Sequence, residues 1–216
     1  MQHTWLKRAG ERDLALFMLG WASTPNAVCH IDPPGCDMLA VYDYTDLQPP
    51  EETLYAPYRR IYLFAWSFGV WVAEQLCCNL PLYKAIALNG TPFPVDERYG
   101  MRLRVVLRTM QTMARTGAPP AGAHAGAADR AMPTGPYPDR SIEAKIEELT
   151  RLAAWSRENS TARLAWDAAF IGDKDEIFPP ERMWAYWRQV GLGTEFSGYH
   201  YPFADPSIVL NQLDPA

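Results

Sequence analysis

Three residues that could together activate a hydroxyl group for attack on an ester lie far apart in this chain: Ser67, Asp175 and His200. Ser67 is the centre of the run 65–69, Ala-Trp-Ser-Phe-Gly, which matches the strand-to-helix turn G-x-S-x-G with alanine at its first position. Such a turn places the hydroxyl at the start of a helix, whose free N–H groups stabilise a developing oxyanion. A serine that only caps an ordinary helix is the alternative, because serine is a favoured N-cap residue.

The order of these residues along the chain favours the catalytic interpretation. Serine, acid and histidine each follow a predicted strand, in the order that α/β hydrolases share. Parallel strands end at the same edge of a sheet, so we expect the three following loops to converge there. His200 would then take the serine proton and pass it to the leaving alcohol, while the acid holds the imidazole in the required tautomer. The alternative for His200 is an ordinary surface histidine.

Two further positions belong to this candidate site. The acid is either Asp175 or Asp173: the first has the spacing expected of the acid loop in Gly-x-x-Asp-x-Ile-x-Pro, whereas the second comes sooner after the strand and could cap the turn. In α/β serine hydrolases the loop after an early strand supplies one main-chain N–H to the oxyanion. Trp21 is the candidate for that donor, and a tryptophan buried in the core is the alternative.

The elements that must position these residues alternate between strands and helices. Short apolar runs predict strands at 4–7, 14–19, 38–42, 61–65, 84–88, 164–171 and 194–196. Helical periodicity is found at 70–76, 101–114, 141–156 and 181–190, with a last helix expected at about 205–213. This alternation predicts an α/β fold, with a mainly parallel sheet flanked by helices. We expect one domain over residues 1–216, with a helical lid insertion at about 92–164 that contains an Ala-, Gly- and Pro-rich loop at 117–136.

Composition narrows the class of protein. The chain has 216 residues, 48% hydrophobic and 21% charged, which suits one globular domain with its own core. No apolar run approaches the roughly 20 residues that span a bilayer, and the first residues lack the apolar region of a signal peptide. The four cysteines show no C-x-x-C spacing, which favours reduced thiols over disulfides or zinc: Cys29, Cys36, Cys77 and Cys78. We expect a cytoplasmic protein without metal or cofactor that binds neither membrane nor nucleic acid.

The net charge of −5 hides an asymmetry. The segment 98–163 carries eleven basic and six acidic residues, a net +5, and the rest of the chain carries −10. A basic segment within an acidic body indicates an anionic partner for that segment, although a solvated helical face is the simpler explanation.

The motifs along most of the chain resemble one known family, the short α/β hydrolases of the BioG type, which are pimeloyl-acyl-carrier-protein methyl ester esterases of biotin synthesis. The run 65–71 around Ser67, with alanine in place of glycine, is the most specific part of this resemblance. The segments that carry it are Leu19-Gly20-Trp21, Tyr42-Asp43-Tyr44, Ala65 to Trp71, Asn89-Gly90-Thr91 and Gly172-Asp173-Lys174-Asp175. The stretch 117–136 matches no motif of the family, so the resemblance says least about the roles of residues in the lid.

The resemblance implies an enzyme that cleaves the methyl ester of pimeloyl-acyl carrier protein and releases methanol, with no metal or organic cofactor. It implies Ser67 as the nucleophile, His200 as the base and Asp175 as the acid. The main-chain N–H groups of Trp21 and Phe68 would form the oxyanion hole.

The resemblance also gives the basic segment a use, since an acyl carrier protein is acidic and its pantetheine arm carries a phosphate. Arginine suits both, because its guanidinium matches the geometry of phosphate and carboxylate. The candidates for this contact are Arg102, Arg104, Arg108, Arg151 and Arg157. Two other functions stay open: a general small-acyl esterase or thioesterase with the same triad, and a catalytically silent hydrolase fold that serves as a binding module. The sequence leaves the oligomeric state open.

Overall fold

The structure is a computed structural model, and it describes residues 1–118 and 133–215. Its strands are β1 (Gln2–Lys7), β2 (Asp13–Met18), β3 (Cys36–Tyr42), β4 (Arg60–Trp66), β5 (Lys84–Leu88), β6 (Ala168–Gly172) and β7 (Thr194–Phe196). Its helices are α1 (Phe68–Leu76), α2 (Leu103–Thr116), α3 (Ile142–Glu158), α4 (Pro180–Trp187) and α5 (Ser207–Leu210), with shorter 3₁₀ turns between them. None of the helices in the described ranges is both long and apolar enough to cross a membrane.

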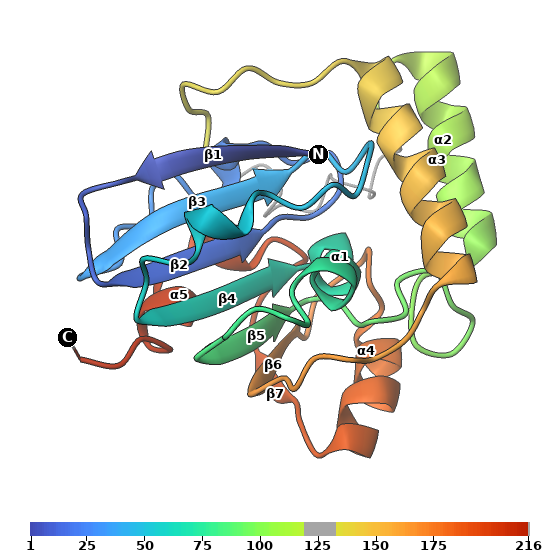
Figure 1. Ribbon diagram of the computed structural model, residues 1–216. Coiled ribbons are helices and arrows are strands. Elements are labelled where there is room, and N and C mark those ends of the chain that lie inside the picture. The colour runs from blue at the N-terminus through green and yellow to red at the C-terminus, as the bar shows by residue number, and fades with distance from the viewer. Residues whose placement is uncertain (119–132, 216) are drawn as a thin grey trace.

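The seven strands form one sheet in the order β1-β3-β2-β4-β5-β6-β7. β1 pairs antiparallel with β3, and all the other neighbours are parallel (Figure 1). The prediction of an α/β-hydrolase fold with a mainly parallel sheet is therefore confirmed. Because the parallel strands all run one way, the loops that follow β2, β4, β6 and β7 lie at one edge of the sheet, the edge at which open α/β sheets bind ligands.

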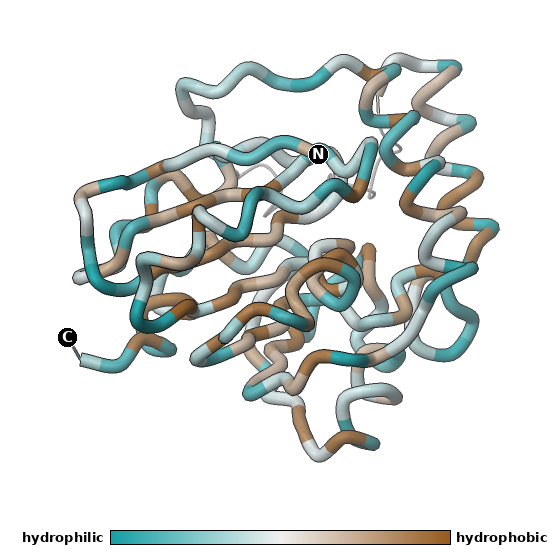
Figure 2. The backbone as a smooth tube through the Cα atoms, in the orientation of Figure 1, coloured by the Kyte–Doolittle hydropathy of each residue, from teal (hydrophilic) through white to brown (hydrophobic). Residues whose placement is uncertain are grey.

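The central strands are buried on both faces, which explains their continuous apolar sequence. All six residues of β2 are buried, and the five from Leu14 to Met18 alternate between two apolar clusters. Leu14 and Leu16 face the cluster that includes α1 and α4, while Ala15 and Phe17 face the cluster that includes α5. Figure 2 shows this pattern as hydrophobic colour along the strands and α1.

The helices α2 and α3 occupy the chain between β5 and β6, where two helices were expected. They lie side by side beyond the carboxyl ends of the parallel strands (Figure 1). The inner face of α2 buries Val106 and Met113, and that of α3 buries Leu149 and Leu152. α3 begins at a serine cap, in which Ser141 Oγ accepts a hydrogen bond from the main-chain N–H of Ala144 at 3.2 Å. Most of the expected loop at 117–136 lies outside the described residues.

Two boundaries differ from the predictions for identifiable reasons. β6 begins at Ala168 rather than at residue 164, because the N–H groups of Arg163 and Leu164 donate to the carboxylate of Glu74 instead of to a neighbouring strand. The expected last helix at 205–213 is the single turn α5, Ser207–Leu210, followed by turns. At these two segments the predicted element is substantially longer than the observed one.

Candidate active site

Ser67 stands in a strained turn between β4 and α1. Its φ and ψ are 58° and −125°, a region that residues other than glycine rarely occupy. The turn is tight enough to require glycine at position 69, because a Cβ atom there would lie 2.1 Å from the main-chain oxygen of Met18. Phe68 is the first residue of α1, where a main-chain N–H has no carbonyl partner within the helix. The turn thus presents a hydroxyl beside an N–H that can receive an anion.

The structure brings Ser67, His200 and Asp175 into one hydrogen-bonded chain. Nε2 of His200 lies 3.0 Å from Oγ of Ser67, and Nδ1 of His200 lies 2.8 Å from Oδ2 of Asp175. The three residues come from the loops after β4, β7 and β6, all at the carboxyl edge of the sheet. The three residues are almost covered, with 4% of Ser67, 4% of Asp175 and 7% of His200 exposed. This chain can move a proton from the serine hydroxyl to the imidazole and stabilise the imidazolium that results.

The two aspartates of the acid loop have different partners. Asp175 is buried, and its Oδ1 atom accepts the main-chain N–H groups of Ile177 at 2.9 Å and Phe178 at 2.8 Å. These contacts leave Oδ2 directed at His200. Asp173 is exposed, and its Oδ1 atom instead accepts the N–H of Gly198 at 2.9 Å, which joins the loop after β6 to the loop after β7. Of the two candidates, Asp175 is the one in contact with the histidine.

A buried asparagine holds the loop that carries His200. Nδ2 of Asn89 donates to the main-chain oxygens of Tyr199 at 2.7 Å and His200 at 3.0 Å, and its Oδ1 accepts the N–H of Gly172 at 2.7 Å. The indole N–H of Trp66 also donates to the His200 oxygen, at 2.8 Å. Sequence reasoning noted Asn89 within a family motif and gave it no role. The available signal was an asparagine directly after a buried strand, where a left-handed turn residue is common.

The loop after β2 lies directly against the serine turn. A Cβ atom on Gly20 would lie 3.2 Å from Cβ of Ser67, so the two loops are in close contact. The indole N–H of Trp21 donates to the main-chain oxygen of Lys145 in α3 at 2.7 Å. Ala22 follows with φ of 61°, again a left-handed conformation on a residue that is not glycine. Trp21, the predicted oxyanion donor, therefore sits in a strained loop between Ser67 and the insertion.

Sequence reasoning did not predict the carboxylate of Glu148 as part of this region. Glu148 is fully buried on the inner face of α3, and it accepts the main-chain N–H groups of Ala22 at 3.0 Å and Tyr44 at 2.9 Å. Arg140 donates to it at 2.5 Å and to Asp43 at 2.5 Å. Burial raises the pKa of Glu148, and Arg140 and the two N–H groups oppose that shift. The sequence signal for Glu148 is an acidic residue on the apolar side of a predicted helix, next to Leu149 and one turn before Leu152.

The five arginines proposed for carrier binding divide into two groups, although all are exposed. Arg102 pairs with Glu97 at 3.5 Å, and Arg151 pairs with Glu147 at 2.8 Å. Three have no ion-pair partner among residues 1–118 and 133–215: Arg104, Arg108 and Arg157. Arg115, which was not singled out, lies on the same outward stripe of α2 as Arg104 and Arg108, at the spacing of one helix face.

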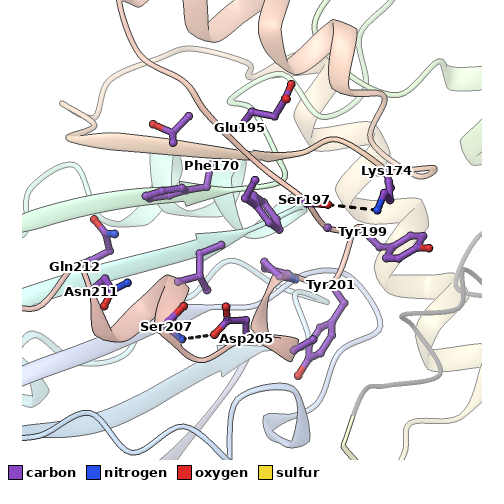
Figure 3. Close-up of a pocket in the computed structure, with 16 residues that line it drawn as sticks. Phe170, Lys174, Glu195, Ser197, Tyr199, Tyr201, Asp205, Ser207, Asn211 and Gln212 are labelled. Atoms are coloured by element: carbon purple, nitrogen blue, oxygen red, sulfur yellow. Dashed lines mark hydrogen bonds between the residues drawn. The ribbon is translucent and has the colours of Figure 1, made fainter.

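A separate groove of about 640 Å³ is shown in Figure 3. It is lined by β6, β7, α5 and the residues around Pro202, and Ser67, Asp175 and His200 are not among its lining residues. None of its lining residues is a histidine, and its serine–lysine contact, in which Lys174 Nζ donates to Ser197 Oγ at 3.3 Å, is exposed to solvent. No group of three or more metal-binding side chains occurs within the part of the chain that the structure describes.

Comparison with known proteins identifies the family and the fold of this chain. A family model described as "Pimeloyl-ACP methyl esterase BioG" matches residues 1–207. The crystal structure of BioG from Haemophilus influenzae is similar with a TM-score of 0.82 and 30% identity, over 94% of this chain and 95% of that one. A lipase-esterase related protein from Clostridium acetobutylicum is similar with a TM-score of 0.60 and 12% identity over 98% and 97%, which shows the fold alone.

A curated relative in Bacteroides fragilis is described as "Malonyl-[acyl-carrier protein] O-methyltransferase". It is 33% identical over 213 residues, which are 95% of this chain, and the chain spans only 42% of the length of that relative. The match to the family model, by contrast, runs over nearly the whole chain, from residue 1 to residue 207. The chain therefore belongs to the BioG family of pimeloyl-ACP methyl esterases.

Proposed function

We propose that this protein is a serine carboxylesterase that hydrolyses the methyl ester of pimeloyl-acyl carrier protein, in biotin synthesis. The observation that carries the proposal is the hydrogen-bonded chain from Ser67 Oγ through His200 to Asp175, at 3.0 and 2.8 Å. Membership of the BioG family supports both the substrate and the reaction class.

The reaction follows from the positions of these atoms. His200 Nε2 takes the proton of Ser67 as Oγ attacks the ester carbonyl, and the tetrahedral oxyanion accepts the main-chain N–H groups of Phe68 and Trp21. The imidazolium gives its proton to the leaving oxygen, so methanol departs and an acyl-serine remains. Water, deprotonated by the same imidazole, then attacks the acyl group. The bond to Ser67 Oγ breaks, Oγ takes the proton back from the imidazolium, and the free carboxylate is released. Asp175 keeps the proton of Nδ1 in place through both halves of the cycle.

The outward stripe of α2 is our proposed contact for the carrier protein. Arg104, Arg108 and Arg115 lie on it, and no carboxylate among the described residues neutralises them. An acidic protein with a phosphate on its prosthetic arm would supply the missing negative charge. Val105 and Leu107 are 47% and 43% exposed on the same helix, which gives the surface an apolar component as well.

Purified protein incubated with pimeloyl-acyl-carrier-protein methyl ester tests the proposal, with methanol release and the mass of the carrier protein as readouts. We expect stoichiometric methanol release that the Ser67→Ala variant does not show. Faster turnover of thioesters or of short p-nitrophenyl esters than of the carrier-linked methyl ester would instead indicate a general esterase or thioesterase. No labelling of Ser67 by a fluorophosphonate would indicate a binding module without catalysis.

A further inference from the structure

The carboxylate of Glu148 joins the insertion to two loops of the catalytic edge. Its Oε2 atom accepts the N–H of Ala22, directly after Trp21, and its Oε1 atom accepts the N–H of Tyr44, directly after Asp43. These loops follow β2 and β3, which are neighbours in the sheet. A single side chain of α3 thus fixes the main chain of two adjacent loops beside Ser67.

Both loops contain a residue in a conformation that requires support. Ala22 and Asp43 have φ values of 61° and 56°, and a residue other than glycine in this region costs on the order of 1–3 kcal/mol. Such strain persists only where the surroundings hold it. Glu148 accepts the N–H of Ala22 itself and the N–H of the residue that follows Asp43, so it acts on each strained turn directly.

The carboxylate is itself held by a buried cation. The side chain of Arg140 is 8% exposed, and its two terminal nitrogens reach Glu148 and Asp43 at 2.5 Å each. A buried carboxylate without a partner would be strongly destabilising, whereas this one has three hydrogen-bond donors. The forked guanidinium fixes the direction in which the carboxylate points, which a single ammonium group would do less well.

Trp21 is held by α3 on two sides. Its indole N–H donates to the main-chain oxygen of Lys145, about one turn before Glu148, and the peptide unit that links it to Ala22 donates to Glu148. These contacts fix the side chain and the following peptide plane of Trp21, and so the direction of its own main-chain N–H. That N–H is the proposed oxyanion donor.

We propose that Glu148, oriented by Arg140, is a positioning residue that holds the main-chain N–H of Trp21 in place for the oxyanion. The inference rests on the proposed serine mechanism and adds to it a role for the insertion, because α3 would hold part of the active site in place. A misplaced oxyanion donor weakens the transition state more than the bound ester, so the turnover number falls while the Michaelis constant stays near its normal value.

The Glu148→Gln variant tests this inference. Glutamine keeps one carbonyl oxygen, and its amide NH₂ would face a donor, so one of the two loop N–H groups loses its acceptor. With p-nitrophenyl acetate as a substrate that needs no carrier protein, we expect kcat per active site to fall about 10- to 100-fold with little change in KM. Fluorophosphonate labelling taken to completion counts the active sites. A purely structural role would instead lower the number of active sites and leave kcat per site unchanged.

Glu74 offers a matched control within the same chain. It is also a fully buried glutamate with three donors, the N–H groups of Arg163 and Leu164 and the indole of Trp166. Those partners lie in the segment that leads into β6, away from the loops around Ser67. Glu74→Gln should lower the melting temperature and leave kcat per active site unchanged.

Arg140→Lys provides a second variant if Glu148→Gln fails to fold, because it keeps the charge and loses the fork that reaches Glu148 and Asp43 together. We expect kcat per site to fall about 3- to 10-fold, again without a matching rise in KM. Unchanged kcat per site in every folded variant of this pair would overturn the positioning role, as would an equal loss in Glu74→Gln. Full activity of Ser67→Ala would overturn the serine mechanism itself, so the two failures are distinguishable.

Discussion

The side-chain amide of Asn89 donates to the main-chain oxygen of His200 at 3.0 Å, and this contact links the end of β5 to the loop after β7. Asn89 also accepts the N–H of Gly172, the last residue of β6, and so it joins three neighbouring strand ends. It is fully buried with φ of 45°. The base of the proposed triad is therefore held by a side chain that takes no part in proton transfer.

Asn89→Asp tests this support. The substitution keeps the size of the side chain and replaces its NH₂ donor by a carboxylate oxygen, which would face two main-chain oxygens. We expect kcat to fall about 10- to 100-fold, because the imidazole no longer keeps its alignment with Ser67. Kinetics with p-nitrophenyl acetate, normalised by fluorophosphonate labelling, provide the measurement. Wild-type kcat per active site in a folded Asn89→Asp variant would contradict this support.

Ser67→Ala should lower ester turnover by at least about three orders of magnitude, because no acyl-enzyme can form. The variant should still fold, since alanine removes one hydrogen bond between the hydroxyl and His200 and leaves the packing of α1 unchanged. Turnover and circular dichroism measured on one preparation separate these effects. Retention of most of the activity would rule out the serine mechanism.

Asp175→Asn should reduce kcat far more than Asp173→Asn. Asp175 faces Nδ1 of His200 at 2.8 Å, whereas Asp173 accepts the N–H of Gly198 and joins the loops after β6 and β7. An amide at position 175 would stabilise the wrong imidazole tautomer, a change that costs on the order of 10⁴ in kcat in a serine protease. The ranking of the two variants by kcat is the measurement, and the reverse ranking would assign the acid to Asp173.

The sequence predicted the parts of this site that depend on local pattern. The turn around Ser67 has a short signature because backbone crowding restricts which residues fit, and Asp175 and His200 follow strands that are recognisable as apolar runs. Glu148 and Arg140 could not be found in this way. Their function depends on contacts with Ala22 and Asp43, about a hundred residues earlier in the chain, and a helical pattern does not show which loop a buried carboxylate will face. The boundary of β6 was misplaced for a related reason, since its preceding residues donate to Glu74.

Asp13 and Arg60, the first residues of β2 and β4, should stabilise the edge of the sheet opposite the catalytic edge without affecting catalysis. Burial raises the pKa of Asp13, but hydrogen bonds and charge from Arg60 and Arg59 outweigh it and hold that pKa below its usual value of 3.8. A lowered carboxyl pKa stabilises the fold at neutral pH, and this stabilisation is lost as pH falls through 3.8 toward the folded-state value. Asp13→Asn should therefore lower the Tm by several degrees at pH 7, by much less near pH 3, and leave kcat unchanged. A Tm difference that persists at pH 3 would contradict this account.

The turnover of carrier-linked substrates should depend on salt more than that of small substrates, because only carrier-linked substrates need the basic surface of α2. Attraction between exposed charges is screened over about 8–10 Å at physiological ionic strength and acts mainly on encounter. Turnover of the carrier-linked ester should therefore fall as salt rises, chiefly through a larger KM, while turnover of p-nitrophenyl acetate is hardly affected.

Arg104→Glu with Arg108→Glu should reproduce this difference between the two substrates at low salt, since neither arginine has an ion-pair partner in the described chain. The control is Arg8→Glu with Arg12→Glu, the same charge change in the exposed turn between β1 and β2, at the amino end of β2. Equal loss of carrier-dependent activity in both double variants would show that net charge, rather than the α2 surface, recruits the carrier protein.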